Sequence, residues 1–414
     1  MERAVGVIII TEKIKKDNWS AGDISGEFSE LVRSARVKLA ETVVCNIKEI
    51  SSSLFLGKGK IDEIRLIAEE QDADVIIFSE DLNGTQQRNI EEIVGIKTID
   101  RTQLILDIFA RRAKSGEGKI QVELAQLEYL LPRLSGDGVM LSRLGGGIGT
   151  RGPGEQKLEV DRRRIRSKVA RLKKDLDSVA KQRSMRRKKR DRFSVLNIAL
   201  VGYTNSGKST LLNALTGAGI QTDNMPFSTL DPTIRKYTLP NNQSVLFTDT
   251  VGFIYKLPHS LVEAFKATLE EVVEADLIVH LLDAGHPKVR EQRDATYVVL
   301  DELKIKDKPI ITVLNKEDKI DDVFLKRRLL KDFKDSLLIS ALNKTNIDEL
   351  IDRIMSHLGG LTTFVRIDLP ADNMRLLHLI YKHGVVKKRI DKGTSVYIEA
   401  QVPQQVMKII ERDI

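Results

Sequence analysis

The sequence predicts an α/β protein made of several domains. Its 414 residues are enough for two to four domains of about 100–200 residues each. Two long stretches, residues 1–112 and 193–360, alternate apolar runs of strand length with helical patterns, which favours sheets of mainly parallel strands. Between them, residues 113–192 show a helical pattern interrupted by glycines, and residues 361–414 are typical of a small α+β domain.

The composition excludes several classes of protein. With 41% hydrophobic and 30% charged residues, the chain is neither disordered nor fibrous. No apolar run approaches the roughly 20 residues that span a bilayer, and the N-terminus has no secretory pattern, so we expect a cytoplasmic protein without membrane contact. The single cysteine, Cys45, excludes an internal disulfide framework and a cysteine-based zinc site. We expect a monomer.

The first region reads as a small α/β domain. Its apolar runs at 4–10, 42–47, 75–78 and 96–99 are expected strands, and the polar segment 13–26 is an expected loop.

The second region reads as a helical hairpin. A helix is expected at 121–134, and eight glycines then fall within the 19 residues 136–154, a density that no regular element tolerates. A second helix is expected from about Glu155. A coiled-coil-like seam along it comprises Leu158, Ile165, Val169, Leu172, Leu176 and Val179.

Positive charge is concentrated in that second helix. Residues 157–192 hold 17 basic and 5 acidic residues, a net charge of +12, so the rest of the chain carries −4 of the overall +8. Such a cluster indicates a polyanionic partner, because lysine and arginine neutralise phosphates and release counterions. The alternative is a solvated helix face or, for residues 185–192, a linker. Arg143 and Arg151 in the adjacent glycine loop favour the polyanion.

A phosphate loop opens the third region. The apolar run 195–201 leads directly into GYTNSGKS, residues 202–209, and then into a helical pattern, which is the context that the GxxxxGK[ST] motif requires. Backbone amides of this loop converge on phosphates, and the helix presents its positive end to them. Lys208 is expected to reach the β- and γ-phosphates, and Ser209 to bind Mg²⁺.

Two further motifs follow in the order that a GTPase requires. DTVG, residues 249–252, comes after the expected strand 245–247. Asp249 is expected in the magnesium shell, and the Gly252 amide is expected to face the γ-phosphate. Between this motif and the phosphate loop lies a switch candidate with two threonines, Thr229 and Thr233, either of which can complete the magnesium shell.

Guanine selection is predicted by NKED, residues 315–318. Asp318 can accept two hydrogen bonds from guanine donors that adenine lacks, which disfavours an ATPase. Asn315 and Lys316 are expected to brace this loop. A backbone amide at Ser340–Ala341, after the expected strand 337–339, is expected to face the guanine O6. The alternative for Asp318 is a helix N-cap.

Two residues bear on catalysis. Phe253 stands where many GTPases carry a water-orienting glutamine, so intrinsic hydrolysis is expected to be slow or to use another group. Asn205 stands where some GTPases use asparagine near a monovalent cation, which suggests K⁺ stimulation; the alternative is that Asn205 only shapes the loop.

The sequence resembles the HflX family of ribosome-associated GTPases, close to the Obg group. The resemblance covers nearly the whole chain and includes the stretch 99–134, the glycine loop GGGIGTRGPGE, the switch FSTLDPT and DTVGFI. It aligns Thr229 with the switch threonine. One departure is GEQKLE where relatives commonly read GETQLE, so no role is carried onto Gln156 and Lys157.

The resemblance implies a Ras-like phosphate-loop GTPase domain at 193–360. This domain would be preceded by an α/β part (1–112) and a basic hairpin (113–192), and followed by a small α+β domain (361–414). It also implies binding to the large ribosomal subunit, with the glycine loop and hairpin entering ribosomal RNA, and splitting or rescue of stalled ribosomes. Some members bind ATP through the N-terminal domain, and the glycine–lysine turn 57–60 is a weak candidate for holding a phosphate there.

The implied cofactors are GTP or GDP, Mg²⁺ and K⁺. The expected catalytic residues are Lys208, Gly252 and Thr229, and the expected metal ligands are Ser209, Thr229 and Asp249. The residues expected to contact nucleotide are Gly202, Tyr203, Thr204, Asn205, Ser206, Gly207, Lys208, Ser209, Thr210, Phe227, Ser228, Thr229, Leu230, Asp231, Asp249, Thr250, Val251, Gly252, Asn315, Lys316, Glu317, Asp318, Ser340, Ala341 and Leu342. The alternative function is a GTP-gated regulator that binds non-ribosomal RNA or a protein partner.

Overall fold

The computed structural model describes the chain except residues 135–152, 192–194, 218, 220–224, 228, 242, 257, 259–260, 262–265, 306, 360–361 and 414. It forms two compact units. The first comprises Met1–Ser178, Asn224–Leu230 and Leu257–Lys266, and the second comprises the remainder. The division of the sequence into four regions stays a prediction.

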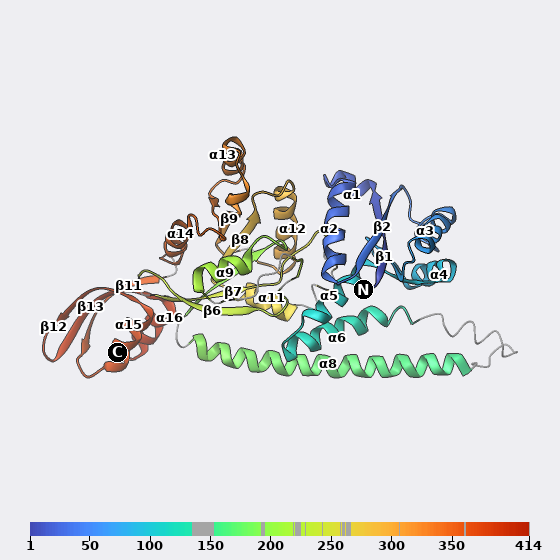
Figure 1. Ribbon diagram of the computed structural model, residues 1–414. Coiled ribbons are helices and arrows are strands. Elements are labelled where there is room, and N and C mark those ends of the chain that lie inside the picture. Colours follow the sequence, from blue (N-terminus) through green and yellow to red (C-terminus); the bar gives the residue numbers. More distant parts are fainter. Residues whose placement is uncertain are drawn as a thin grey trace. The chain divides into compact units, whose positions relative to one another are not determined.

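The first unit contains a four-stranded parallel sheet (Figure 1). Its strands are β1 (Arg3–Thr11), β2 (Lys38–Ile47), β3 (Val75–Phe78) and β4 (Lys97–Ile99), in the order β2-β1-β3-β4. Its helices are α1 (Glu12–Lys16), α2 (Ala21–Ser34), α3 (Lys58–Glu70), α4 (Gly84–Val94) and α5 (Arg101–Arg112). The parallel α/β domain predicted for this region is confirmed.

The expected loop at 13–26 is wrong, because α1 and the start of α2 occupy it. Ser20 and Asp23 form a capping box: the Ser20 hydroxyl accepts from the Asp23 amide at 3.1 Å, and the Asp23 carboxylate accepts from the Ser20 amide at 2.9 Å. Trp19 and Phe28 are buried on either side of this cap. The turn predicted at 57–60 is also wrong, since α3 begins at Lys58.

The helical hairpin is formed by α6 (Gly116–Leu130) and α8 (Pro153–Asp191). The first helix begins earlier than expected because the Ser115 hydroxyl caps it, accepting from the Gly118 amide at 2.8 Å. It also ends at Leu130 rather than 134.

Ion pairs link the two helices of the hairpin. Lys173 pairs with Glu128 at 2.8 Å and Lys168 pairs with Glu123. Leu172 is buried and Ile165 half-buried, as the predicted seam requires. The loop residues 136–152, with Arg143 and Arg151, lie outside the described part of the chain, as do the side chains of Leu158 and residues 186–190.

The second unit is built on a six-stranded sheet. Its strands are β5 (Leu196–Gly202), β6 (Thr233–Thr238), β7 (Ser244–Asp249), β8 (Leu277–Asp283), β9 (Ile310–Asn315) and β10 (Leu337–Leu338). Their order is β10-β9-β8-β5-β7-β6, and among these pairings β6 alone is antiparallel to its neighbour. The helices are α9 (Lys208–Thr216), α11 (Lys266–Val273), α12 (Val289–Glu302), α13 (Val323–Asp332) and α14 (Ile347–Gly359).

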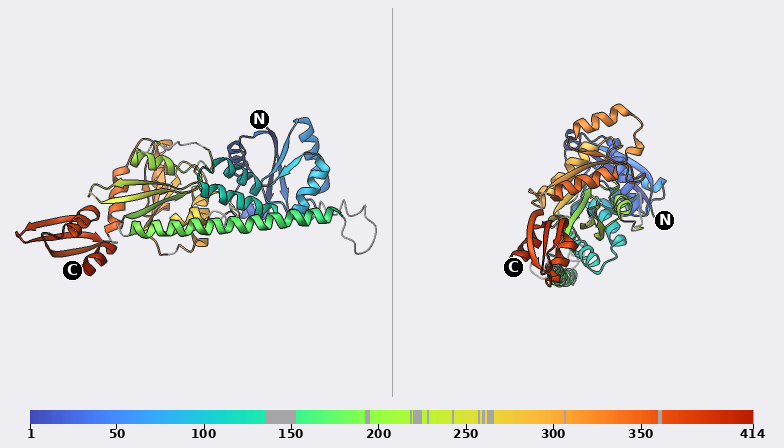
Figure 2. Two further views of the ribbon diagram at one scale, coloured as in Figure 1. Left: turned by 90° about the horizontal axis from the view of Figure 1, so that it is seen from below. Right: turned by 90° about the vertical axis from the view of Figure 1, so that its left-hand side faces the viewer.

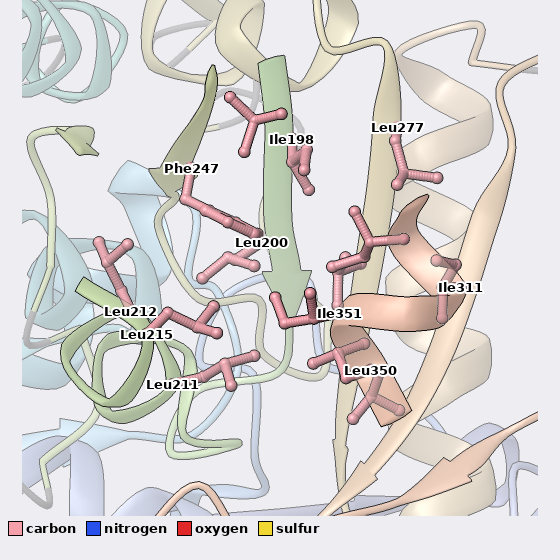
Figure 3. Close-up of a cluster of buried hydrophobic side chains, with 14 of the residues drawn as sticks. Ile198, Leu200, Leu211, Leu212, Leu215, Phe247, Leu277, Ile311, Leu350 and Ile351 are labelled. Carbon is pink, nitrogen blue, oxygen red and sulfur yellow. The ribbon is translucent and has the colours of Figure 1, made fainter. Parts of the chain in front are cut away.

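A buried core fixes the phosphate loop between sheet and helix. Figure 3 shows side chains of α9, among them Leu211 and Leu215, facing Leu200 and Phe247 from the sheet. Leu350 of α14 belongs to the same cluster. Burying side chains of this size stabilises the fold by about 1.5–3 kcal/mol each, so the strand and helix that flank the loop are held as one rigid body.

The C-terminal region, predicted as a small α+β domain, forms a strand, a helix, two strands and a helix (Figure 2, red). These elements are β11 (Thr362–Pro370), α15 (Met374–His383), β12 (Val385–Asp391), β13 (Ser395–Pro403) and α16 (Gln404–Asp413). The antiparallel sheet has the order β11-β13-β12, and Gly393, at φ 82°, supplies the positive φ of the turn between β12 and β13.

Candidate nucleotide site

Parallel strands bring the sequence motifs to one edge of the sheet. Gly202 ends β5, Asp249 ends β7, Asp283 ends β8 and Asn315 ends β9. The register pairs Leu200 with Asp249 and Asp283 with Asn315, so these ends are adjacent. The carboxyl edge of a parallel sheet is where α/β proteins bind ligands.

Two glycines of the phosphate loop leave no space for a side chain. A Cβ on Gly202, which has φ 153°, would lie 2.2 Å from the Leu281 carbonyl oxygen. A Cβ on Gly207, which has φ 96°, would lie 2.2 Å from Nδ2 of Asn315. The Ser206 side chain is buried, and its hydroxyl has no partner among the described residues. The loop is therefore a close-fitting backbone cradle with polar groups turned inward, which fits a phosphate ligand.

Lys208 lies at the start of α9 with its amine inside the loop. Its Nζ donates to the carbonyl oxygens of Gly202 at 3.1 Å and Tyr203 at 2.9 Å. Burial lowers the pKa of Lys208 to about 8, and the nearby Asp249 carboxylate opposes that shift. A Cβ on Gly252 would lie 3.1 Å from the same Nζ, so the amine lies beside the DTVG glycine.

Nucleotide affinity is expected to fall above pH 8. Phosphates stabilise protonated Lys208, so the pKa of this lysine is higher in the complex than in the free protein. Below pH 7 the lysine is charged in both states, so Lys208 contributes no pH dependence to binding there. At pH 9 the free protein has lost most of this proton, and the dissociation constant for GDP is expected to rise about tenfold. Calorimetry at pH 9 in two buffers of different ionisation enthalpy is expected to show uptake of about 0.9 proton; binding without proton uptake would contradict this assignment.

The predicted magnesium ligands Ser209 and Asp249 lie together. The Ser209 hydroxyl donates to Oδ2 of Asp249 at 2.6 Å, and Asp249 is fully buried. No cluster of three or more histidine, cysteine or acidic residues suited to a metal exists among the described residues. The Ser209 hydroxyl and the Asp249 carboxylate would fill only a small part of a magnesium coordination shell. The remaining positions would be left to water and phosphate oxygens, which is how Mg²⁺ is usually bound.

Thr229 belongs to the segment 224–230 of the first unit, whereas Ser209 and Asp249 belong to the second, so Thr229 as a magnesium ligand stays a prediction. Ser228 lies outside the described residues. Phe227 is buried, with its ring 4.6 Å from that of Phe109, so any contact of Phe227 with nucleotide comes from its backbone.

Asn315 of the NKED motif ties three segments together. Its Nδ2 donates to the Ser206 carbonyl at 2.8 Å, and its Oδ1 accepts from the Ala341 amide at 2.9 Å. The bracing role predicted for Asn315 is therefore present. The Ala341 amide is engaged by Asn315, which leaves the amide of the next residue, Leu342, as the candidate donor to guanine O6.

Asp318 and Lys316 are positioned by side chains from neighbouring loops. The Ser340 hydroxyl donates to Asp318, and Lys316 pairs with Asp283 at 2.7 Å. Asp318 lies inside a 3-10 turn, Glu317–Lys319, whose N-cap is Lys316, so the alternative of an N-cap role for Asp318 is wrong. Asp283 was not among the predicted site residues, although an acidic residue at the end of a buried strand is a signal for it.

Phe253 is fully buried and cannot face a reacting water. Its amide donates to the Gly202 carbonyl at 3.1 Å, and its carbonyl accepts from the Thr204 amide at 2.7 Å. The residue therefore joins the DTVG motif to the phosphate loop by backbone hydrogen bonds. Seven further residues of the predicted site lie within these motifs or next to them in the sequence. They are Thr204, Thr210, Leu230, Asp231, Thr250, Val251 and Glu317.

Comparisons with known proteins identify the family of this chain. Four family models match in order: GTP-binding GTPase N-terminal at 24–110, GTP-binding GTPase Middle Region at 112–190, 50S ribosome-binding GTPase at 197–316 and HflX C-terminal domain at 326–414. GTPase HflX of Caldanaerobacter subterraneus subsp. tengcongensis is 44% identical over 400 residues, which are 96% of this chain and 91% of the relative. The chain belongs to the HflX family of GTPases.

Other HflX relatives match over similar lengths. GTPase HflX of Escherichia coli is 38% identical over 91% of this chain and 89% of its own length. A solved GTP-binding protein from Sulfolobus solfataricus in complex with GDP is 25% identical, with a TM-score of 0.44, and covers 87% of this chain and 100% of its own. The predicted HflX resemblance, fold class and GTPase activity are confirmed. None of the described helices has the length and apolar character to cross a membrane.

Proposed function

We propose that this HflX-family GTPase binds the large ribosomal subunit when it carries GTP, and that it dissociates or rescues stalled ribosomes under stress. The observation that carries the proposal is the second hairpin helix, α8. It is 39 residues long and contains nearly all of the segment 157–192, whose net charge is +12. A helix of that charge supplies affinity for RNA phosphates. The match to a family described as 50S ribosome-binding GTPases supports the ribosome as the source of that RNA.

The roles of the site residues in this proposal follow from their chemistry. Lys208 and the phosphate-loop amides hold the phosphates, and Asp318 selects guanine. Ser209, Thr229 and Asp249 hold Mg²⁺, which neutralises charge on the phosphates. Because Phe253 is buried, water is positioned by switch backbone or by a group on the ribosome. Such a protein acts in the cytoplasm, as a monomer, with the hairpin tip at ribosomal RNA.

Potassium is expected to stimulate GTP hydrolysis. Asn205 lies in the phosphate loop at φ 61°, where an amide oxygen can help hold a monovalent cation beside the phosphates. Turnover measured in KCl is expected to exceed turnover in NaCl at equal ionic strength, and Asn205→Ala is expected to remove the difference. Equal rates for the wild-type protein in the two salts would contradict a cation role.

Co-sedimentation with purified ribosomal subunits tests the ribosome as partner. The protein is expected to pellet with the large subunit in a non-hydrolysable GTP analogue and to be released in GDP. Replacing Arg186, Arg187, Lys188, Lys189 and Arg190 with glutamine is expected to weaken pelleting and flatten its salt dependence. A protein that stays in the supernatant in both nucleotides would contradict the proposal and favour the alternative, a GTP-gated regulator of other RNA or protein partners.

A further inference from the structure

The C-terminal sheet is covered on one face only. Along β11, the side chains of Val365, Ile367 and Leu369 are buried in a core shared with α15 and α16. The alternating residues Phe364 and Arg366 are exposed, and Phe364 retains 43% of its surface. Because successive residues of a strand point to opposite faces, these two lie on the face away from the core that β11 shares with α15 and α16.

The neighbouring strands continue this open face. In the register, Arg366 lies opposite Glu399 of β13, and Glu399 lies opposite Lys388 of β12. Asp368 lies opposite Tyr397 in the same way. The open face therefore carries charged and aromatic side chains, together with one exposed aliphatic residue, Ile390, which lies opposite Tyr397. The covered face is aliphatic along β11 and β13, whereas β12 places Arg389 and Asp391 on that side.

Cations lie against both aromatic rings of the open face. The Arg366 guanidinium is 5.3 Å from the centroid of the Phe364 ring, and the Lys387 Nζ is 5.7 Å from it. The Lys392 Nζ is 5.3 Å from the Tyr397 ring. Aromatic rings beside positive charges provide what a nucleotide in a single strand needs, because bases stack on the rings and phosphates pair with the cations.

The two acidic residues of the face do not cancel this charge. Glu399 is 3.9 Å from Arg366 and accepts from the Tyr397 hydroxyl at 2.9 Å, and Asp368 pairs with Lys392. With Lys387 and Lys388 added, the face holds four cations and two carboxylates, a net charge of +2.

We propose that this face, defined by Phe364, Arg366, Lys387, Lys388, Lys392 and Tyr397, binds an unpaired segment of RNA. Bases stack on Phe364 and Tyr397, and backbone phosphates pair with the cations between them. An apolar protein partner would require a contiguous apolar area on this face. Here charged side chains separate the two rings, so the face suits a polyanion better than an apolar protein surface. The proposal goes beyond the hairpin contact proposed above and does not depend on it.

Binding of a fluorescently labelled, unstructured 12-nucleotide oligouridylate to the full chain tests this proposal. Phe364→Leu keeps apolar bulk but removes the ring, and it is expected to weaken binding about tenfold. Phe364→Trp is expected to bind at least as tightly as the wild type. The matched control is Phe324→Leu on α13, since Phe324 is 80% exposed and is expected to have no effect.

The basic hairpin is a second RNA contact that can mask this loss. The titration is therefore repeated in the variant with glutamine at positions 186–190, where the residual affinity is expected to fall with Phe364→Leu. Equal affinity of the Phe364 and Phe324 variants in both backgrounds would overturn the proposal and leave the face to a protein partner.

Photocrosslinking locates the contact without any substitution in the face. Oligouridylate carrying 4-thiouridine is expected to crosslink to the tryptic peptide 354–366, which contains Phe364. The peptide 393–408, which contains Tyr397, is a second expected site of crosslinking. Crosslinks in other peptides, with none in either of these two, would overturn the proposal.

Discussion

Replacing Lys208 with alanine is expected to weaken GTP and GDP binding by at least about 100-fold and to abolish measurable hydrolysis. The amine is buried and held by two carbonyl oxygens of the loop, so it is already placed where phosphates bind. Charge-assisted hydrogen bonds contribute about 1.5–3 kcal/mol each, and Lys208 is expected to make one to each of two phosphates. Together they amount to about 3–6 kcal/mol, which corresponds to a factor of 100 or more.

Calorimetric titration with GDP and a phosphate-release assay measure this effect. Lys331→Ala is the matched control, because it removes the same charge from an exposed position on α13 of the same unit. Thermal unfolding of both variants without nucleotide is expected to resemble the wild type. Near-normal affinity in a folded Lys208→Ala variant would contradict the assignment of the phosphate loop.

Asp318→Asn is expected to exchange guanine specificity for xanthine specificity. In the proposed site, the carboxylate is expected to accept from guanine N1–H and from the exocyclic amine. An asparagine can accept only one of these bonds and turns a donor toward the amine. We expect GTP affinity to fall about 100-fold, because one charge-assisted bond is lost and two donors face each other. Xanthine has a carbonyl in place of the amine, so its nucleotide is expected to bind the variant well.

Competition between labelled GDP and unlabelled GDP or XDP measures the exchange. The control is Asp321→Asn, which changes an exposed acid three residues away. Unchanged GDP affinity in the Asp318 variant would mean that another group reads the base. Ser340, whose hydroxyl donates to Asp318, is a positioning residue, and Ser340→Ala is expected to weaken GDP binding less than Asp318→Asn does.

Sequence reasoning could place the phosphate loop, DTVG and NKED at the ends of strands because the signals for these positions are local, and the structure has them there. Each motif directly follows a buried strand, and parallel strands place their carboxyl ends at one edge. The geometry of Gly202 and Gly207 then follows from close backbone approach. The engagement of the Ala341 amide by Asn315 could not be predicted, since it joins loops 26 residues apart.

The predictions that were wrong or missing depend on contacts that a reading along the chain does not show. Residues 13–26 look polar along the chain, yet the capping pair Ser20 and Asp23 starts a helix whose apolar face includes Phe28. The open face of the C-terminal sheet could not be predicted from the sequence either, because its aromatic rings and cations come from separate segments of the chain. Only the observed register places Arg366 and Lys388 beside the same Glu399.

The central claim is that a guanine nucleotide binds at the carboxyl edge of the second unit's sheet, between residues 202–209 and 315–318. Displacement calorimetry on the full chain with Mg²⁺ tests it most directly. GDP is expected to bind with a stoichiometry of one and to be displaced by a GTP analogue but not by ATP, even if ATP binds elsewhere on the chain. No binding heat from either guanine nucleotide, or displacement of GDP by ATP at equal concentration, would contradict it.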